Sequence, residues 1–173
     1  VIEVTDNEIV MVYENKNFKQ VLTAGRYTFW NSLVDYKFVT ADLSKIDITE
    51  NVNKALFNTV QLRPYIRVFE VAAFEKAIMI ANDTFVKILD HGTYHFWNNE
   101  QTIKILKADM RQLQLEIAGQ ELLTKDKATV RINFYAQYKV TDIETALMHN
   151  KDYEKQLYIT LQLALRAFVG AYT

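Results

Sequence analysis

AGRYTFWN at residues 24–31 and HGTYHFWN at residues 91–98 are two closely similar octets, and together they contain both tryptophans of the 173-residue chain. The octets lie 67 positions apart. When the sequence is compared with itself at this offset, the match extends without a gap over residues 8–48 and 75–115. Similarity over this length indicates a duplicated structural unit rather than a short local motif.

Each copy has the pattern of a β-hairpin followed by a sharp corner. A β-rich run leads into a polar turn, at residues 14–17 in the first copy and 82–84 in the second, and a further β-rich run follows. Gly25 and Gly92 then mark a corner that requires either positive φ or close backbone approach. Another strand is predicted after each octet. We therefore expect an α+β fold built from two related, mainly antiparallel β-modules in tandem.

The two copies differ after residue 48. The first continues with Val52, Leu56 and Val60, a four-residue spacing that predicts a short helix ending near the only proline, Pro64. The second alternates strictly between apolar and polar residues over 129–140, which predicts a long antiparallel strand paired through the turn TKDK. We expect an N-terminal β-module at 1–64, a partial repeat of the second, and a core domain at 65–173.

Two helices are predicted to close the chain. Thr141 and Glu144 form a capping-box pattern, and Asp152 can cap a longer helix that Gly170 ends. One apolar face of this last helix is formed by Leu157, Leu161, Leu165 and Phe168, and much of the remaining surface is also apolar. One sheet cannot cover both sides, so this face is a candidate oligomer interface. The alternative is a helix that belongs wholly to the core.

Composition gives no support for enzymatic chemistry. A net charge of −1 offers no basic face for nucleic acid, and the chain has no cysteine. The four glycines all have structural places, and neither Ser32 nor Ser44 lies in a nucleophile motif. His91 and His95 flank the Gly92 corner rather than one turn of a helix, and a metal site would also need a third ligand. We therefore predict no catalytic residue, no cofactor, no metal and no partner nucleic acid. No run reaches the ~18 apolar residues of a membrane-spanning helix.

The stretches GQELLTKDKATVRINFYAQYKVTDIETAL and LYITLQLALRAFVG resemble the stomatin/prohibitin/flotillin/HflK-HflC superfamily, also called SPFH or band 7. The resemblance is closest to its stomatin-like slipin branch. It covers residues 65–173, whereas residues 1–64 match only through the internal repeat. The family's characteristic segments correspond here to Leu123–Asp126, Tyr138–Val140, Asp142–Ala146 and Leu165–Arg166.

This resemblance implies a non-enzymatic, membrane-associated scaffold on the cytoplasmic face that self-assembles as a homo-oligomer and acts on partner membrane proteins. A regulatory subunit of a membrane protease is the alternative within the family. A soluble ligand-binding β-protein is the alternative from another class, because β-modules can enclose apolar pockets. An apolar anchor before Val1 and heptads after Thr173 would favour the scaffold over the soluble protein.

The resemblance also implies that the first β-module lies close to the membrane. The aromatic pairs of the two corners, Phe29, Trp30, Phe96 and Trp97, are therefore candidate contacts with a bilayer interface or a partner. The alternative is that all four fill the cores of their modules. We expect Trp97 to be buried and Trp30 to be partly exposed.

Overall fold

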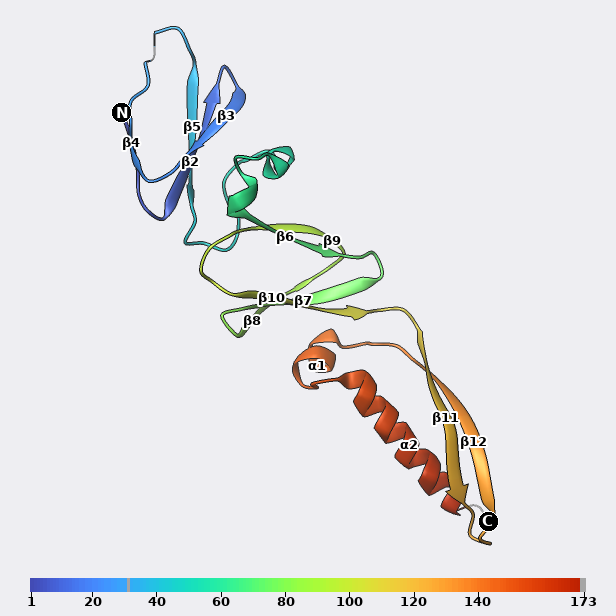
Figure 1. The fold of residues 1–173 in the computed structure, drawn as a ribbon. Coiled ribbons are helices and arrows are strands. Elements are labelled where there is room, and N and C mark those ends of the chain that lie inside the picture. Colours follow the sequence, from blue (N-terminus) through green and yellow to red (C-terminus); the bar gives the residue numbers. More distant parts are fainter. Residues whose placement is uncertain (31, 172–173) are drawn as a thin grey trace. The chain divides into compact units, whose positions relative to one another are not determined.

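A computed structural model describes residues 1–30 and 32–171, and their contacts divide the chain into two compact units (Figure 1). Unit 1 comprises Val1–Glu70 and Thr93–Thr102, and unit 2 comprises Val71–Gly92 and the chain from Ile103 onward. The fold is α+β, with mainly antiparallel strands and two α-helices near the C-terminal end, as expected from the sequence.

Unit 1 contains three small groups of paired strands. Its elements are β1 (Ile2–Val4), β2 (Glu8–Glu14), β3 (Asn17–Leu22), β4 (Gly25–Tyr27), β5 (Tyr36–Asp42), the 3₁₀ helices η1 (Lys54–Asn58) and η2 (Arg63–Tyr65), β6 (Ile66–Val71) and most of β9 (Gly92–Trp97). β1 pairs with β4, β6 pairs with β9, and β2 lies between β3 and β5. One buried cluster packs residues of β2, β5, η1 and β6 around Trp97.

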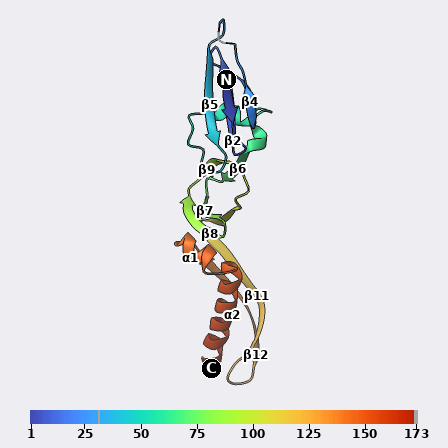
Figure 2. The same ribbon diagram turned by 90° about the vertical axis from the view of Figure 1, so that its left-hand side faces the viewer.

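Unit 2 contains a three-stranded sheet, a long hairpin and the two α-helices. Its elements are β7 (Glu75–Ala81), β8 (Thr84–Leu89), β10 (Ile103–Asp109), β11 (Leu113–Leu123), β12 (Thr129–Tyr138), α1 (Ile143–Met148) and α2 (Tyr153–Ala171). β7 lies between β8 and β10, and α1 packs on β7 and β10 through Ile143 and Leu147. α2 runs alongside the β11–β12 hairpin and contacts β11 (Figure 2).

The two three-stranded sheets share the same register at the offset of 67 residues. Glu8 lies opposite Asp42 in the first sheet, and Glu75 lies opposite Asp109 in the second. Both hairpins carry an irregularity at the equivalent position, between Val12 and Tyr13 in the first and between Met79 and Ile80 in the second. The backbone bond from Leu43 N to Asn7 O recurs from Met110 N to Phe74 O. The similarity seen in the sequence therefore extends to individual hydrogen bonds.

The turns and corners predicted from the sequence are confirmed. Asn15 and Lys16 have φ of 48° and 69°, and Asn82 and Asp83 have φ of 49° and 60°. Two consecutive residues with positive φ define the turn that suits the right-handed twist of a two-residue hairpin. The corner glycine of the second copy, Gly92, has a φ of 142°, a value that strains residues with a side chain.

The long strand and the cap of the last helix are also confirmed. β12 pairs with β11 with one register shift, and its burial alternates as predicted from Arg131 to Tyr138, whereas Val130 is exposed. The turn between these strands is closed by a bond from Thr124 N to Ala128 O at 3.0 Å. Asp152 accepts a bond from Lys155 N at 3.0 Å and so caps α2.

Three local predictions need correction. The short helix predicted from Val52, Leu56 and Val60 is divided into two 3₁₀ helices, η1 and η2. Asn53 caps the start of η1, and the bond from Thr59 N to Leu56 O ends it before Val60. The N-cap of α1 is Asp142 rather than Thr141, since the Asp142 carboxylate accepts from Thr145 N at 3.1 Å. α2 continues through Gly170 to Ala171, because glycine is tolerated inside a helix at modest cost.

Residues 93–102 come from the second sequence copy and yet belong to unit 1. They reach it because β9 pairs with β6 and because Asp47 forms a bridge with Phe96. The predicted boundary between modules 1–64 and 65–173 is based on the sequence repeat, and as a domain boundary it stays a prediction. The compact units follow the pairing of the strands.

Candidate functional site

The two tryptophans of the repeated octets lie in opposite surroundings. Trp97 is 0% exposed in the core of unit 1, and its indole Nε1 donates to Glu50 Oε2 at 3.2 Å. Trp30 is 83% exposed in the loop between β4 and β5. The expected difference in burial is therefore present. Asn31, the last residue of the first octet, lies outside the described residues.

The phenylalanines beside the tryptophans are packed in unit 1. Phe96 is buried, and its ring lies 6.0 Å from that of Phe69. Phe29 is half-buried, with its ring 5.1 Å from the rings of both Tyr36 and Phe38. Of the four aromatic residues singled out in the sequence, Trp30 alone presents most of its surface to solvent.

Sequence reasoning missed Leu33, a second large apolar residue of the same loop. Its side chain is 93% exposed, three positions after Trp30. No periodic signal could have found it, because the loop belongs to neither a helix nor a strand. Trp30 and Leu33 therefore form an exposed apolar pair, called here the β4–β5 loop pair. An exposed tryptophan and an exposed leucine in one loop suit contact with a membrane interface or a protein groove.

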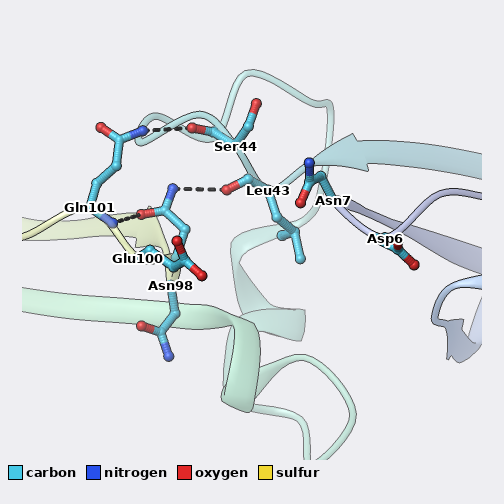
Figure 3. Close-up of a pocket in the computed structure, with 8 residues that line it drawn as sticks. Asp6, Asn7, Leu43, Ser44, Asn98, Glu100 and Gln101 are labelled. Carbon is cyan, nitrogen blue, oxygen red and sulfur yellow. Dashed lines mark hydrogen bonds between the residues drawn. The ribbon is translucent and has the colours of Figure 1, made fainter.

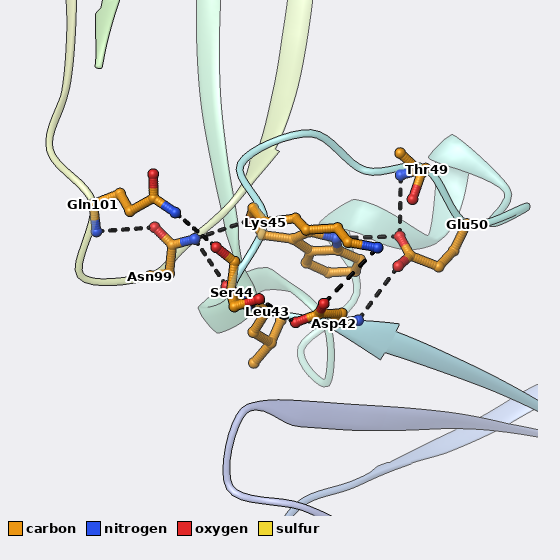
Figure 4. Close-up of polar contacts among 9 residues, drawn as sticks. Asp42, Leu43, Ser44, Lys45, Thr49, Glu50, Asn99 and Gln101 are labelled. Carbon is orange, nitrogen blue, oxygen red and sulfur yellow. Dashed lines mark hydrogen bonds and ion pairs between the residues drawn. The ribbon is translucent and has the colours of Figure 1, made fainter. Parts of the chain in front are cut away.

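A network of polar contacts holds Trp97 and the residues after it (Figure 4). Asn99 Nδ2 donates to the carbonyl oxygens of Leu43 and Lys45, each at 2.8 Å. Gln101 Nε2 donates to Ser44 O at 2.6 Å. These bonds satisfy the backbone of the loop that follows β5, and so they fix Trp97 against the core of unit 1.

Arg67 completes this network from β6. Its guanidinium donates to Trp97 O at 3.2 Å, to Gln101 O at 2.7 Å and to Asn99 Oδ1 at 2.6 Å. Partial burial lowers the pKa of Arg67, since the charged form loses solvation, although an arginine remains charged at any physiological pH. The guanidinium group, which often binds carboxylates in proteins, here donates its hydrogen bonds to carbonyl oxygens. The network is structural rather than catalytic.

A pocket of about 410 Å³ opens beside this network in unit 1 (Figure 3). Asn99, Gln101 and Ser44 line it, but their polar groups are already bonded to one another. Asp6 and Glu100 are its charged residues. Among the residues that the structure describes, no three metal-binding side chains come together. The described lining of this pocket is therefore held by its own hydrogen bonds.

The two histidines flanking Gly92 belong to different units. His95 packs its ring 4.9 Å from that of Phe57 in unit 1. Burial, and then the nearby charge of Lys54, lower the pKa of His95 and favour its neutral form. His91 belongs to unit 2.

The candidate interface on α2 is only partly covered. Leu157, Leu161 and Leu165 are half-buried, whereas Phe168 is 60% exposed. No residue of α2 is fully buried. Two further apolar side chains, Ile159 and Leu163, are also exposed, the latter to 58%. The helix therefore keeps apolar surface beyond the predicted face, which is typical of a surface that another chain covers.

Polar contacts fix α2 against the hairpin. Gln162 Nε2 donates to Gln120 Oε1 at 2.6 Å, and the Tyr138 hydroxyl donates to Glu154 Oε1 at 2.8 Å. Burial, and then the bond to Glu154, raise the pKa of Tyr138 far above its ordinary value. The phenol therefore stays protonated and keeps this bond at any physiological pH. Among the described residues, no helix is both long and apolar enough to span a bilayer.

The fold and the candidate surfaces define a class of protein: an α+β domain with mainly antiparallel strands and a partly uncovered apolar helix near its C-terminal end. The sequence profile of the SPFH domain / Band 7 family matches residues 2–173. The chain therefore belongs to this family. The match includes residues 2–64, which the resemblance seen in the sequence reached only through the repeat.

Two curated archaeal relatives share shorter segments with the chain. An uncharacterized protein of Methanocaldococcus jannaschii is 38% identical over 66 residues, which cover 38% of this chain and 33% of the relative. An uncharacterized protein of Archaeoglobus fulgidus is 37% identical over 65 residues, covering 36% of this chain and 25% of the relative. The matched segments thus span a third or less of each relative's length.

Proposed function

We propose that this protein is a non-enzymatic, membrane-associated scaffold that assembles with copies of itself and organises membrane-protein partners. The observation that carries the proposal is the match to the SPFH domain / Band 7 family along nearly the whole chain. The exposed apolar surface of α2 supports the self-assembly, and the β4–β5 loop pair supports the membrane contact. The absence of a metal cluster among the described residues is compatible with the proposal and does not carry it.

Two finer statements belong to this proposal. The sequence over Leu123–Asp126 and Tyr138–Val140 favours the stomatin-like slipin branch of the family. The shared register of the two three-stranded sheets supports two related modules in tandem that arose by duplication. In this proposal the protein lies at the cytoplasmic face of the membrane.

Self-assembly is tested by charge placed on α2. We expect Leu163→Lys to leave the chain folded and to lower its self-association, because Leu163 is exposed and its burial in an assembly would leave an unpaired ammonium. The matched control is Gln156→Lys, an exposed position on the same helix. Sedimentation velocity of the full-length protein over a range of concentrations measures the association. A full-length protein that stays monomeric throughout would contradict the scaffold.

Leu161→Lys separates an interface from a core position. Leu161 is half-buried, so a lysine there should lower the thermal stability of unit 2 as well as the association. Melting is followed by circular dichroism beside sedimentation. Unchanged melting together with unchanged association would remove this face from both roles.

Membrane contact is tested by tryptophan fluorescence. Trp30 is exposed and Trp97 is buried, so only Trp30 should shift its emission to the blue when vesicles are added. The shift should vanish in Trp30→Phe, which keeps Trp97 as an internal reference. An unchanged spectrum of the unmodified protein with vesicles of every composition tried would contradict the membrane contact.

The two alternatives give different results in these tests. A regulatory subunit of a membrane protease would co-purify with a protease from solubilised membranes and change its rate of cleavage. A soluble ligand-binding protein would neither associate nor respond to vesicles.

A further inference from the structure

The sheet of the second copy contains a lysine–aspartate ion pair, and the first copy has two lysines at the equivalent positions. Lys104 of β10 lies opposite Ile80, and its Nζ is 2.7 Å from Oδ1 of the turn residue Asp83. The hydrogen bond from Lys104, and then its charge, lower the pKa of Asp83. The hairpin geometry thus brings the second turn residue next to a side chain of the neighbouring strand.

The first copy has two lysines at the equivalent positions. Lys16 stands 67 residues before Asp83, and Lys37 stands 67 residues before Lys104. Lys37 lies opposite Tyr13, which is the register of Lys104 and Ile80, and Lys16 has the positive φ of the same turn. The shared backbone therefore places two lysines at the positions that form an ion pair in the second copy.

Nothing in the described part of the chain neutralises these lysines by direct contact. The side chains of Lys16 and Lys37 form no hydrogen bond or ion pair with another described residue. Most other lysines of the two sheets do have a carboxylate within reach, as Lys19 has in Glu14 and Lys107 in Glu75. Two like charges held side by side are unfavourable, and a bound anion would relieve them.

Both lysines line one pocket of about 520 Å³ in unit 1, together with Tyr13, Asp35, Asn51 and Asn53. The pocket is rich in donors, with two ammonium groups, the Tyr13 phenol and two side-chain amides. Burial raises the pKa of Tyr13, which keeps its hydroxyl protonated as a donor. Asp35 supplies the one carboxylate, so the lining carries one net positive charge.

We propose that this pocket, the Lys16–Lys37 pocket, binds a phosphate-type oxyanion. Two ammonium groups and neutral donors around one cavity suit a tetrahedral anion, which accepts several hydrogen bonds at once. The Asp35 carboxylate can accept from a hydroxyl group of a protonated phosphate. The ligand is either a free phosphate compound or the phosphate of a lipid headgroup. This inference stands apart from the scaffold proposal, since it needs neither assembly nor a membrane.

The second copy supplies the variant that tests the site. Lys16→Asp recreates the Asp83–Lys104 arrangement opposite Lys37, and aspartate tolerates the positive φ of the turn. The variant should therefore fold at least as well as the unmodified chain while losing the anion site. Lys127→Asp is the matched control, since Lys127 is also a turn lysine with positive φ, at 64°, but lies in unit 2.

The first arm titrates inorganic phosphate against chloride at constant ionic strength, so that general screening stays the same. Amide resonances of Tyr13, Lys16 and Lys37 should move and saturate. The affinity should fall about tenfold or more in Lys16→Asp, stay within about twofold in Lys127→Asp, and rise in Asp35→Asn. Melting curves show that each variant is folded.

The second arm uses vesicles of phosphatidylcholine with and without phosphatidic acid, whose headgroup exposes a phosphate monoester. Saturable binding of phosphate alone identifies a free phosphate compound as the ligand, and binding that requires phosphatidic acid identifies the lipid. Both results support the site if Lys16→Asp removes the binding. The site is refuted if neither probe gives a saturable response, or if Lys16→Asp and Lys127→Asp respond equally.

Discussion

The octets at 24–31 and 91–98 differ far less in sequence than in their surroundings. Each leaves a hairpin, turns at a glycine and ends in an aromatic pair, but Trp97 is fully buried in unit 1 and Trp30 protrudes into solvent. The difference begins after the tryptophan. Where the second copy has Asn99 and Gln101, the first has Ser32 and Val34. Burial of the same local motif is therefore decided by the contacts that its neighbours make.

The partners of Trp97 also come from far away in the sequence. The Glu50 carboxylate accepts a hydrogen bond from the indole N–H, and Ile46 O accepts one from Trp97 N at 2.9 Å. Arg67 donates a hydrogen bond to Trp97 O. A buried indole needs such a partner for its N–H, and a buried strand end needs partners for its carbonyl groups. The comparison teaches that a repeated motif can be a core element in one copy and an exposed contact in the other.

The largest expected difference in stability is between substitutions of the two tryptophans. We expect Trp97→Ala to lower the free energy of unfolding by about 3–5 kcal/mol, because it leaves a large cavity in the core of unit 1. Trp30→Ala should change it by less than about 0.5 kcal/mol, since the side chain is exposed. Urea denaturation followed by circular dichroism measures both. Equal losses for the two variants would contradict the assigned burial.

A smaller effect on stability is expected at Asn99, where the two copies differ in sequence. Asn99→Ala removes the donor to Leu43 O and Lys45 O, and it leaves one group of Arg67 without its closest acceptor. We expect a loss of about 1–3 kcal/mol in the free energy of unfolding. Ser32→Ala, at the equivalent exposed position, is the control and should stay within about 0.5 kcal/mol. If the Ser32 and Asn99 variants behave alike, the network does not account for the burial of Trp97.

The smallest effect exchanges the charges of the two hairpins. Lys16→Asp should raise the Tm, and Asp83→Lys should lower it, each on the order of 1 °C at low salt, because exposed ion pairs contribute little. The pKa of Asp83 is lowered in the folded chain, so the pair stabilises above the ordinary carboxyl pKa of about 3.9. The effect of Asp83→Lys should fade as the pH falls below that value. Shifts that persist in high salt would argue against an electrostatic origin.

Part of the candidate surfaces could be predicted from the sequence. The exposure of Trp30 agrees with expectation, whereas the exposure of Leu33 was not foreseen. A loop residue carries no periodicity, so its exposure depends on where the flanking strands end. The Lys16–Lys37 pocket could have been suspected from the repeat, because an offset of 67 already aligns Lys16 with Asp83 and Lys37 with Lys104.

The sequence by itself determined the local elements of this protein: both hairpin turns, the Gly92 corner, the long β12 strand and the Asp152 cap. These features depend on residues close together in the chain, where backbone sterics and side-chain capping decide the conformation. The tertiary structure alone decided that residues 93–102 join unit 1 and that Trp97 is buried there. Those outcomes rest on long-range pairing of β9 with β6 and on bonds to Arg67, and neither is encoded within the octet.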